Sequence, residues 1–425
     1  MSAADWTTKP LGELFAVAAG KTMSAAARSG ENKVPFLRTS NVLWDEIDLC
    51  EVDQMAIPEQ ELAAKLVEPG DLLVCEGGEI GRAAIWEGGR TPMSFQNHLH
   101  RLRPMADDVD PRFYVYFLQS AFTQLGLFEG AGNRTTIPNL SSGRLKALDV
   151  PHPPFLEQVA IADSLRYVQR ARHLNAGLLA TTEELKAAAM HQLFTRGLRG
   201  DALKETEFGP MPCRWEGATI DKRYTVIPGG TPSRSNAAYW VGGTIPWVKT
   251  TEVNYSVITE TEEHITRAGL DQSAAKMLQP GTLLMAMYGQ GVTRGKVAIL
   301  GIEASCNQAC AAMIPTDDKV TPRYLYHFLT SRYEAIRSLA HGGQQQNLNL
   351  DIVRSIDFPV PPTIDEQQEI VDVIDALDSK IRLHRRKRSV LDQLFESLLH
   401  KLMTGEISVY DLDLSALPSI DGSAA

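Results

Sequence analysis

Three short motifs in the chain have the residue types of catalytic or cofactor-binding sites. Phe128-Glu-Gly-Ala-Gly132 has the spacing of a methyl-donor loop, and His152-Pro-Pro-Phe155 resembles an element that holds a target amino group. Gly289-Gln-Gly-Val-Thr-Arg-Gly-Lys296 resembles a phosphate loop, but Val297 stands where Ser or Thr must hold magnesium. The first motif follows no strand, and the second lacks its acceptor residue. We therefore interpret all three as loops or helix stops and predict no catalytic residues.

Polar residues suited to hydrogen-bonded recognition gather instead in loops between predicted strands. Arg can donate two parallel hydrogen bonds to guanine, Asn and Gln can pair with adenine, and Lys binds phosphates. For any one residue, turn capping or solvation is the simpler explanation, but these loops recur at equivalent places in the chain. The candidate nucleic-acid-binding residues are Lys21, Arg28, Arg38, Thr39, Asn41, Arg82, Asn133, Arg134, Thr231, Ser233, Arg234, Lys249, Thr250, Glu252, Tyr288, Gln290, Arg294, Gln344, Gln345 and Asn347.

Length and composition place the chain among ordinary globular proteins. Its 425 residues are too many for one core, and 44% of them are hydrophobic and 22% charged. No apolar run is long enough to cross a membrane, so we expect a cytoplasmic protein. The five cysteines lack metal-site spacing, and no metal is expected. The formal net charge of -10 argues against indiscriminate coating of nucleic acid.

An internal repeat covers nearly the whole chain. Pro111-Arg-Phe-Tyr-Val-Tyr-Phe-Leu-Gln-Ser120 recurs as Pro322-Arg-Tyr-Leu-Tyr-His-Phe-Leu-Thr-Ser331, 211 residues later. Val150-Pro-His-Pro-Pro-Phe-Leu-Glu-Gln158 recurs as Phe358-Pro-Val-Pro-Pro-Thr-Ile-Asp-Glu-Gln367. The chain is therefore two copies of one unit.

Each copy begins with short β-branched runs and one short helix, and ends in a long helix. Predicted strands are Val34–Leu37, Asp71–Cys75, Ala83–Trp86, Ile245–Val248, Thr282–Ala286 and Lys296–Leu300. The short helices are Pro111–Ser120 and Pro322–Ser331. The first long helix is Phe155–Arg196, with an apolar stripe at Ile161, Leu165, Val168, Leu178, Leu185 and Leu193.

The second long helix has the clearest pattern in the sequence. Thr363 precedes Glu366 at capping-box spacing, and Gly405 stands where a left-handed C-cap is expected. Between them lies a heptad seam of Ile370, Ile374, Leu377, Ile381, His384, Arg388, Leu391, Phe395, Leu398 and Leu402. The basic run Arg382–Arg388 is either a solvated face or a functional contact, with phosphates or with Glu183 and Glu184 of the first long helix. His384 and Arg388 would form a polar layer of the seam that fixes the register of the helices.

These patterns predict an α+β fold in which an antiparallel pair of long coiled-coil helices separates two repeated α/β domains. The predicted boundaries are 1–153 and 211–361 for the α/β domains, 154–210 and 362–405 for the helical spacers, and 406–425 for a mobile polar tail. The simpler alternative is that each long helix only covers its own domain.

The duplicated Pro-x-Pro-Pro…Glu-Gln motif and the Leu-Phe-Thr and Leu-Met-Thr-Gly helix ends make the chain resemble the DNA-specificity subunit of type I restriction–modification systems. The resemblance spans residues 1 to about 405. It implies that each α/β domain is a target-recognition domain for one half of a bipartite site in double-stranded DNA. It also implies a non-catalytic chain.

The resemblance implies partners as well. The long helices would dock two methyltransferase (modification) subunits, and restriction/translocase subunits would complete the complex. S-adenosylmethionine, ATP and Mg²⁺ would bind those partners, with no cofactor on this chain. The residues implied to form the partner-binding surface are Phe155, Glu157, Gln158, Glu366 and Gln367.

The DNA-reading subunit has two rivals: a protein-only scaffold that clamps partners through its coiled coil, and an enzyme with cryptic methyltransferase activity. If the chain reads DNA, we expect the two domains to lie on one face of the duplex, roughly 34–36 Å apart.

Overall fold

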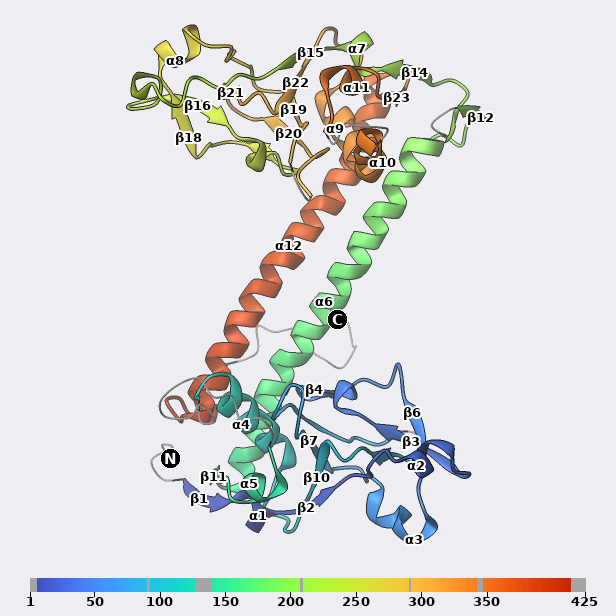
Figure 1. The fold of residues 1–425 in the computed structure, drawn as a ribbon, viewed down its shortest axis with the longest axis vertical. Helices are drawn as coiled ribbons and strands as arrows, with labels where there is room; N and C mark the ends of the chain where they lie inside the picture. The colour runs from blue at the N-terminus through green and yellow to red at the C-terminus, as the bar shows by residue number, and fades with distance from the viewer. Residues whose placement is uncertain are drawn as a thin grey trace. The chain divides into compact units, whose positions relative to one another are not determined.

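The computed structural model describes residues 6–89, 92–126, 140–206, 209–289, 292–341 and 347–413. The chain divides into two compact units: unit 1 is Met1–Gly177 with Arg385–Ala425, and unit 2 is Leu178–His384. Two long helices, α6 (Phe155–Arg196) and α12 (Ile364–Met403), each contribute one half to each unit (Figure 1).

The α/β part of unit 1 is built on a four-stranded antiparallel sheet. Its strands are β2 (Phe15–Ala19), β10 (Leu99–Pro104), β7 (Leu72–Cys75) and β8 (Ala83–Ile85), in that order. The smaller sheets are β6 (Asp53–Ala56), β3 (Lys33–Leu37) and β9 (Ser94–Phe95); β1 (Thr7–Pro10) with β11 (Asp149–His152); and β4 (Val42–Leu43) with β5 (Glu46–Ile47). The helices are α1 (Leu11–Leu14), α2 (Ala25–Ser29), η2 (Thr39–Asn41), α3 (Glu59–Leu62), η3 (Ala63–Lys65), α4 (Pro111–Thr123), α5 (Ser142–Lys146) and η7 (Val409–Asp411).

Unit 2 repeats this plan. Its main sheet has the order β15 (Tyr224–Pro228), β22 (Cys310–Pro315), β19 (Leu283–Ala286), β20 (Val297–Leu300) and β17 (Val257–Ile258). The smaller sheets are β18 (Glu263–Ile265), β16 (Ile245–Val248) and β21 (Ser305–Cys306); β14 (Glu216–Thr219) with β23 (Asp357–Val360); and β12 (Leu203–Thr206) with β13 (Gly209–Pro212). The helices are α7 (Ile220–Arg223), η4 (Ala237–Tyr239), η5 (Thr250–Glu252), α8 (Arg267–Asp271), α9 (Pro322–Ser331), α10 (Tyr333–Ser338), η6 (Leu339–His341) and α11 (Leu350–Arg354).

Each main sheet is apolar on both faces because it separates two cores. In β7, Leu72 and Val74 join the core that contains α4, whereas Leu73 and Cys75 point into a second core. Strands β19 and β20 divide their residues between two cores in the same alternating way. This explains why the predicted strands appear in the sequence as continuous apolar runs, and all six are confirmed.

Helix α12 begins and ends where its sequence signals predict. The Glu366 backbone N–H donates to Thr363 Oγ1 at 3.3 Å, and Gly405 adopts a φ of 66°. Gly197, which follows α6, also has a positive φ of 64°. A left-handed residue just beyond the last helical turn is the usual stop, and glycine adopts it without steric cost.

In each unit the two helix halves share one core with the α/β part. In unit 1 this core contains Ile161, Leu165 and Val168 of α6 and Phe395, Leu398 and Leu402 of α12. In unit 2 it contains Met190, Leu193 and Phe194 of α6 and Ile370, Val371 and Ile374 of α12. The first half of one helix thus meets the second half of the other in both units, which makes the pair antiparallel and confirms the predicted fold class.

The seam residues of α12 are buried for most of its length. Buried positions are Ile370, Ile374, Ile381, Leu391, Phe395, Leu398 and Leu402. Leu377 and His384 are half-buried. Arg388 is exposed, so it is not a buried layer of the seam.

The apolar stripe predicted for α6 is wrong in its middle. Leu178 and Leu185 are 53% and 55% exposed, whereas Asn175, Leu179 and Thr182 are buried. The buried face keeps heptad spacing from Ile161 to Leu193, but polar residues occupy several of its positions. Thr182 Oγ1 satisfies its own hydrogen bond by donating to the Leu178 carbonyl at 2.6 Å.

The predicted mobile tail begins with a packed segment. Val409 in η7 is 7% exposed, and it joins the unit 1 core with Ile407 and Leu412 packed against it. The prediction of mobility is therefore wrong for residues 406–413, because three apolar side chains have a core to enter. Residues 414–425 lie outside the described part of the chain.

No helix among the described residues is both long enough and apolar enough to span a bilayer.

Replacing Ile374 by Ala should cost about 2–5 kcal/mol of unfolding free energy, because this fully buried side chain leaves a cavity in the unit 2 core. The matched control is Val373→Ala on the same helix turn, where the side chain is 41% exposed. We expect the control to stay within about 0.5 kcal/mol of the parent chain in denaturant unfolding. Equal losses in the two variants would contradict this packing.

Candidate nucleic-acid interface

The two units place a cation at the same point, where a strand ends and a short 3₁₀ turn begins. In unit 1, Arg38 follows β3 and its Nη1 lies 3.0 Å from Asp53 Oδ2. In unit 2, Lys249 follows β16 and its Nζ pairs with Glu262 on the approach to β18. The scaffold thus repeats while the cation and its acidic partner differ.

The residue three positions later holds each turn in shape. Asn41 Oδ1 accepts from the Arg38 N–H at 2.8 Å, and Glu252 Oε2 accepts from the Lys249 N–H at 2.6 Å. Asn41 is 4% exposed and also donates to the carbonyls of Asp48 and Glu51, at 2.9 and 2.8 Å.

Asn41 and Glu252 were predicted as DNA contacts, but the structure uses both as internal supports. The second carboxylate oxygen of Glu252 accepts from the Glu262 N–H at 3.0 Å. Because the hydrogen-bonding atoms of these two side chains are taken up by the turns, they shape the loops that carry Arg38 and Lys249. Turn capping, the simpler explanation, holds at these positions.

In unit 2 the structure brings Arg234 and Lys249 together on one carboxylate. Arg234 Nη1 donates to Glu263 Oε2, and Lys249 Nζ lies 3.6 Å from Glu263 Oε1. The Arg234 guanidinium also lies over the rings of Trp240 and Trp247, 3.7 and 4.9 Å from their centroids. Sequence analysis did not identify these tryptophans or Glu263, because no residue pattern links three separate segments of the chain.

Charge pairing shifts the pKa values of two residues in this group, Glu263 and Lys249. The hydrogen bond from Arg234 is the main factor that holds the pKa of Glu263 below its usual value. The hydrogen bond to Glu262 is the main factor that raises the pKa of Lys249. Glu263 and Lys249 are therefore both charged near neutral pH.

The other predicted residues of unit 2 lie in several places. Thr231 Oγ1 donates to Gln308, and Thr250 Oγ1 donates to Asn307 Oδ1 at 2.9 Å. Ser233 Oγ lies 2.9 Å from Ser235 Oγ. Tyr288 is 43% exposed, Asn347 is exposed and Arg294 is half-buried. Gln290, Gln344 and Gln345 lie outside the described residues.

In unit 1 the predicted residues form smaller groups. Arg82 donates from Nη2 to the Thr39 carbonyl at 3.2 Å and pairs through Nη1 with Glu79 at 3.1 Å. Lys21 pairs with Glu61 at 2.7 Å, and Arg28 is exposed on α2. Asn133 and Arg134 lie outside the described residues.

The residues predicted to bind partners are mostly inside the fold. Phe155 is 40% exposed, but Glu157, Gln158, Glu366 and Gln367 are 5% exposed or less. Their burial shows that the Glu-Gln motif positions the helix starts, so a partner could contact Phe155 but not the other four side chains directly.

The two glutamines make the same connection in both units. Gln158 Oε1 accepts from the Asp110 N–H at 2.9 Å, at the start of α4. Gln367 Oε1 accepts from the Thr321 N–H at 3.0 Å, at the start of α9. Glu366 accepts from Trp215 Nε1 at 3.2 Å and from Arg214 Nη2 at 2.7 Å. The start of each long helix is thus fixed to the α/β part of the unit in which that start lies.

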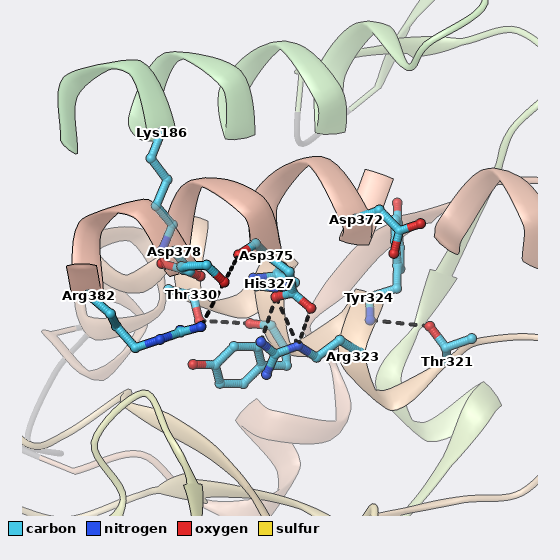
Figure 2. A network of polar contacts seen from close by, with 12 residues as sticks. Lys186, Thr321, Arg323, Tyr324, His327, Thr330, Asp372, Asp375, Asp378 and Arg382 are labelled. Carbon is cyan, nitrogen blue, oxygen red and sulfur yellow. Dashed lines mark hydrogen bonds and ion pairs between the residues drawn. The ribbon is translucent and has the colours of Figure 1, made fainter. Parts of the chain in front are cut away.

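A polar network in unit 2 adds to this attachment (Figure 2). Asp375 of α12 accepts from Arg323 Nη2 at 2.5 Å and lies 2.8 Å from His327 Nε2. Lys186 of α6 pairs with Asp378 at 2.6 Å. His327, Asp375 and Asp378 lie close enough together to bind a metal ion. However, Arg323 and Lys186 already neutralise the two carboxylates. We therefore interpret the group as a set of polar contacts that link α12 to α9 and to α6.

The corresponding position in unit 1 has a different set of hydrogen bonds. Arg112 Nε donates to Asp45 Oδ1 at 2.9 Å, and Tyr116 stands where His327 stands in unit 2, donating to Asp45 Oδ2 at 2.5 Å. The arginine is repeated, but its acidic partner lies on a loop of the α/β part instead of on the long helix.

The motifs that imitate catalytic sites have structural roles or lie outside the described residues. His152 is 8% exposed, with Nδ1 2.8 Å from Tyr114 Oη and Nε2 3.2 Å from Asp108. Lys296 donates to Asn254 Oδ1 at 2.8 Å. Residues 127–139, which include Phe128–Gly132, are not among those described.

Comparison with known proteins places most of the chain in one group. Residues 3–184 and 215–393 match the model of the type I restriction modification DNA specificity domain. The chain is 23% identical over 415 residues to the putative type I restriction enzyme MjaX specificity subunit of Methanocaldococcus jannaschii, covering 95% of this chain and 94% of that protein. It is 27% identical over 274 residues to the EcoR124I/EcoR124II specificity subunit of Escherichia coli, covering 63% of each.

A solved structure has the same fold. The S subunit of a type I restriction–modification system from M. genitalium matches with a TM-score of 0.59 at 16% identity, over 94% of this chain and 96% of that one.

Replacing His327 by Gln should reduce the sensitivity of the fold to acid. Burial is the main factor that lowers the pKa of His327, which faces Arg323, Asp375 and Asp378. The unfolded chain therefore binds a proton near pH 6.5 that the folded chain resists, so stability is present above this pH and is lost as the pH falls through it. Between about pH 7.5 and about pH 5.5, the unfolding temperature of His327→Gln should fall less than that of the parent, by roughly 1–3 °C.

The control for this measurement is His191→Gln, at an exposed position on α6. It should follow the parent chain at every pH. A His327→Gln curve parallel to that of the parent would show that His327 is not the acid-sensitive group.

Proposed function

The chain belongs to the DNA-specificity family of type I restriction–modification systems, and we propose from this premise that each of its units recognises one half of a bipartite DNA target. Target-recognition domains at 1–153 and 211–361 would contact the half-sites. The helical segments 154–210 and 362–405 would set their spacing and bind two methyltransferase subunits. This family is defined by DNA specificity, so the protein-only scaffold has no support.

The observation that carries this proposal is the repeated turn with a different cation in each unit. Arg38 and Lys249 stand at the same structural position, each paired with an acidic residue of the neighbouring strand region. A repeated scaffold with divergent side chains is what two recognition sites for different sequences require. DNA binding would replace the carboxylates by phosphates or base edges.

Catalysis would belong to the partner subunits. Where the structure describes the motifs that resemble catalytic sites, their side chains bond within the fold. The polar side chains that recur in both units are suited to hydrogen-bonded recognition. We propose that methyltransferase subunits bind S-adenosylmethionine and that a separate restriction subunit uses ATP and Mg²⁺. The chain itself would determine where these activities are directed.

The helix pair offers a surface for those partners. In unit 2, Leu178 and Leu185 of α6 and Val373 and Leu383 of α12 are between 41% and 64% exposed. Leu178 and Leu185 are one heptad apart, so they project from the same side of the helix. Apolar side chains at this spacing favour docking of a helix from another chain.

The first test removes the two cations one at a time. Lys249→Ala should weaken recognition of the second half-site only, and Arg38→Ala of the first only, with about 1–3 kcal/mol of discrimination lost in each case. Methylated sites would be mapped in a genome carrying the complete complex. Lys222→Ala, an exposed position of α7, serves as the control. Loss of both half-sites in either variant would contradict independent recognition.

A second test addresses the partner surface. The double substitution Leu178→Glu/Leu185→Glu should lower co-purification of the methyltransferase subunit at least tenfold, because two charges replace the exposed apolar contact. The unfolding temperature of the isolated chain should not change, since surface substitutions have small effects. Val241→Glu, at a position 76% exposed in unit 2, is the matched control. Normal assembly of the double variant would show that the methyltransferase subunit does not bind through Leu178 and Leu185.

A further inference from the structure

Arg234 is held by two aromatic rings and by a carboxylate. It lies in the loop between β15 and η4, with its guanidinium carbon 3.7 Å from the Trp240 ring centroid and 4.9 Å from that of Trp247. The two indoles meet edge to face at 5.1 Å. Stacking on an aromatic face fixes the plane of a guanidinium, and a second ring fixes its position.

The tryptophans are themselves anchored to the loop that carries Arg234. Trp240 Nε1 donates to the Ser233 carbonyl at 3.0 Å, and Trp247 Nε1 donates to the Gly230 carbonyl at 2.9 Å. Asn236 Oδ1 accepts from the Ala238 N–H at 3.1 Å and begins η4. Since these bonds hold the loop without Arg234, the loop does not need the guanidinium for its shape.

One edge of the guanidinium is occupied, and the other is open. Nη1 donates to Glu263 Oε2, whereas Nε and Nη2 make no hydrogen bond with any residue that the structure describes. The side chain is 53% exposed. Nε and Nη2 are two parallel donors on the same side of a planar group, which matches the O6 and N7 acceptors of guanine in the major groove.

Glu263 has two effects on this arrangement. It orients Nη1 and so directs the free edge of the guanidinium. Together with Glu262, it also places negative charge beside Arg234 and Lys249. A duplex that offers no guanine to Arg234 would bring its phosphates near these carboxylates without a compensating bond. The carboxylates therefore disfavour the wrong sequence as Arg234 favours the right one.

Unit 1 has no matching arrangement among its described residues. Arg28 is exposed on α2 and Arg38 pairs with Asp53, and neither lies over an aromatic ring. Arg101 of unit 1 does lie over the Phe95 ring, 5.7 Å from its centroid, but its side chain is only 12% exposed. Among the predicted recognition residues that the structure describes, an exposed arginine over aromatic rings is therefore found in the second recognition domain.

We propose that Arg234, backed by Trp240 and Trp247 and oriented by Glu263, determines one guanine in the second half-site. This inference rests on the proposed function, because it assigns a base to a site that must first bind DNA. Trp240, Trp247 and Glu263 act as positioning residues, and the contact to guanine is made by Arg234.

The test maps methylated sites in cells that carry the complete complex with Arg234→Gln, Arg234→Lys or Arg267→Gln. Arg234→Gln should lose about 10- to 100-fold of discrimination at one guanine of the second half-site and leave every other position unchanged. Arg234→Lys should relax the same position, because an ammonium group cannot form the parallel pair of bonds. Arg267→Gln is the matched control: Arg267 is 76% exposed and pairs with Asp271, but it has no aromatic support.

A second measurement separates a guanine contact from a structural effect. In the parent complex, 7-deazaguanine at that position, which lacks N7, should weaken duplex binding about tenfold or more. In the Arg234→Gln complex the same replacement should have no further effect. Glu263→Gln should instead raise binding to random duplexes while the guanine stays preferred.

Two results would overturn the assignment. If Arg234→Gln left the methylated sequence unchanged, or weakened all positions of the second half-site alike, Arg234 would not determine a base. A failure of the proposed function has a different signature, since both half-sites would then change together in the Lys249→Ala and Arg38→Ala variants.

Discussion

The burial of two narrow apolar seams is the constraint on which the rest of the fold depends. A helix of about forty residues cannot cover its own seam, and half of each long helix lies in each unit. Each unit therefore needs a part of both long helices. Unit 2 obtains both from one continuous stretch, Leu178–His384, whereas unit 1 combines Met1–Gly177 with Arg385–Ala425. Gln158 and Gln367 then fix the start of each helix to the short helix beside it, so the α/β parts have a defined attachment.

The proposed recognition would depend on the exchange of one ionic partner for another. Its net charge is -10, and its loop cations are paired with carboxylates of the same unit. Exposed ion pairs contribute only about 0–1 kcal/mol, so a phosphate or a base edge can replace the carboxylate at little cost. The acidic residues would then limit binding to duplexes that provide such a replacement. An acidic protein can thus be selective for DNA without coating it.

The sequence predicts the repeated architecture well because it depends on local periodicity. Strand runs, Pro stops, the Thr363 cap and the heptads of α12 are each visible within about twenty residues. The middle of α6 was mispredicted because Asn175 and Thr182 occupy buried positions while Leu178 and Leu185 face solvent. Residue hydrophobicity favoured the wrong face there. Heptad spacing counted back from Leu193 would have been the better guide.

The candidate site was only partly predictable, for a different reason. Loop polarity pointed to Arg38, Lys249 and Arg234, but it also selected Asn41 and Glu252, whose atoms are used to shape their own turns. Whether a polar side chain supports a turn or faces outward depends on its neighbours in space. Arg234 lies in a loop, Trp240 directly follows a 3₁₀ helix and Trp247 lies in a strand. No spacing in the sequence predicts that these three side chains stack.

The packed segment around Val409 has a consequence for synthesis on the ribosome. The main core of unit 2 is made from residues between Met190 and Ile374, whereas that of unit 1 extends from Leu11 to Val409. The lobe translated first is therefore the one that must wait for the last part of the chain before its interior is complete. Domains usually finish folding in the order in which they are translated. We expect this order to be reversed here, with unit 1 completing its fold after unit 2.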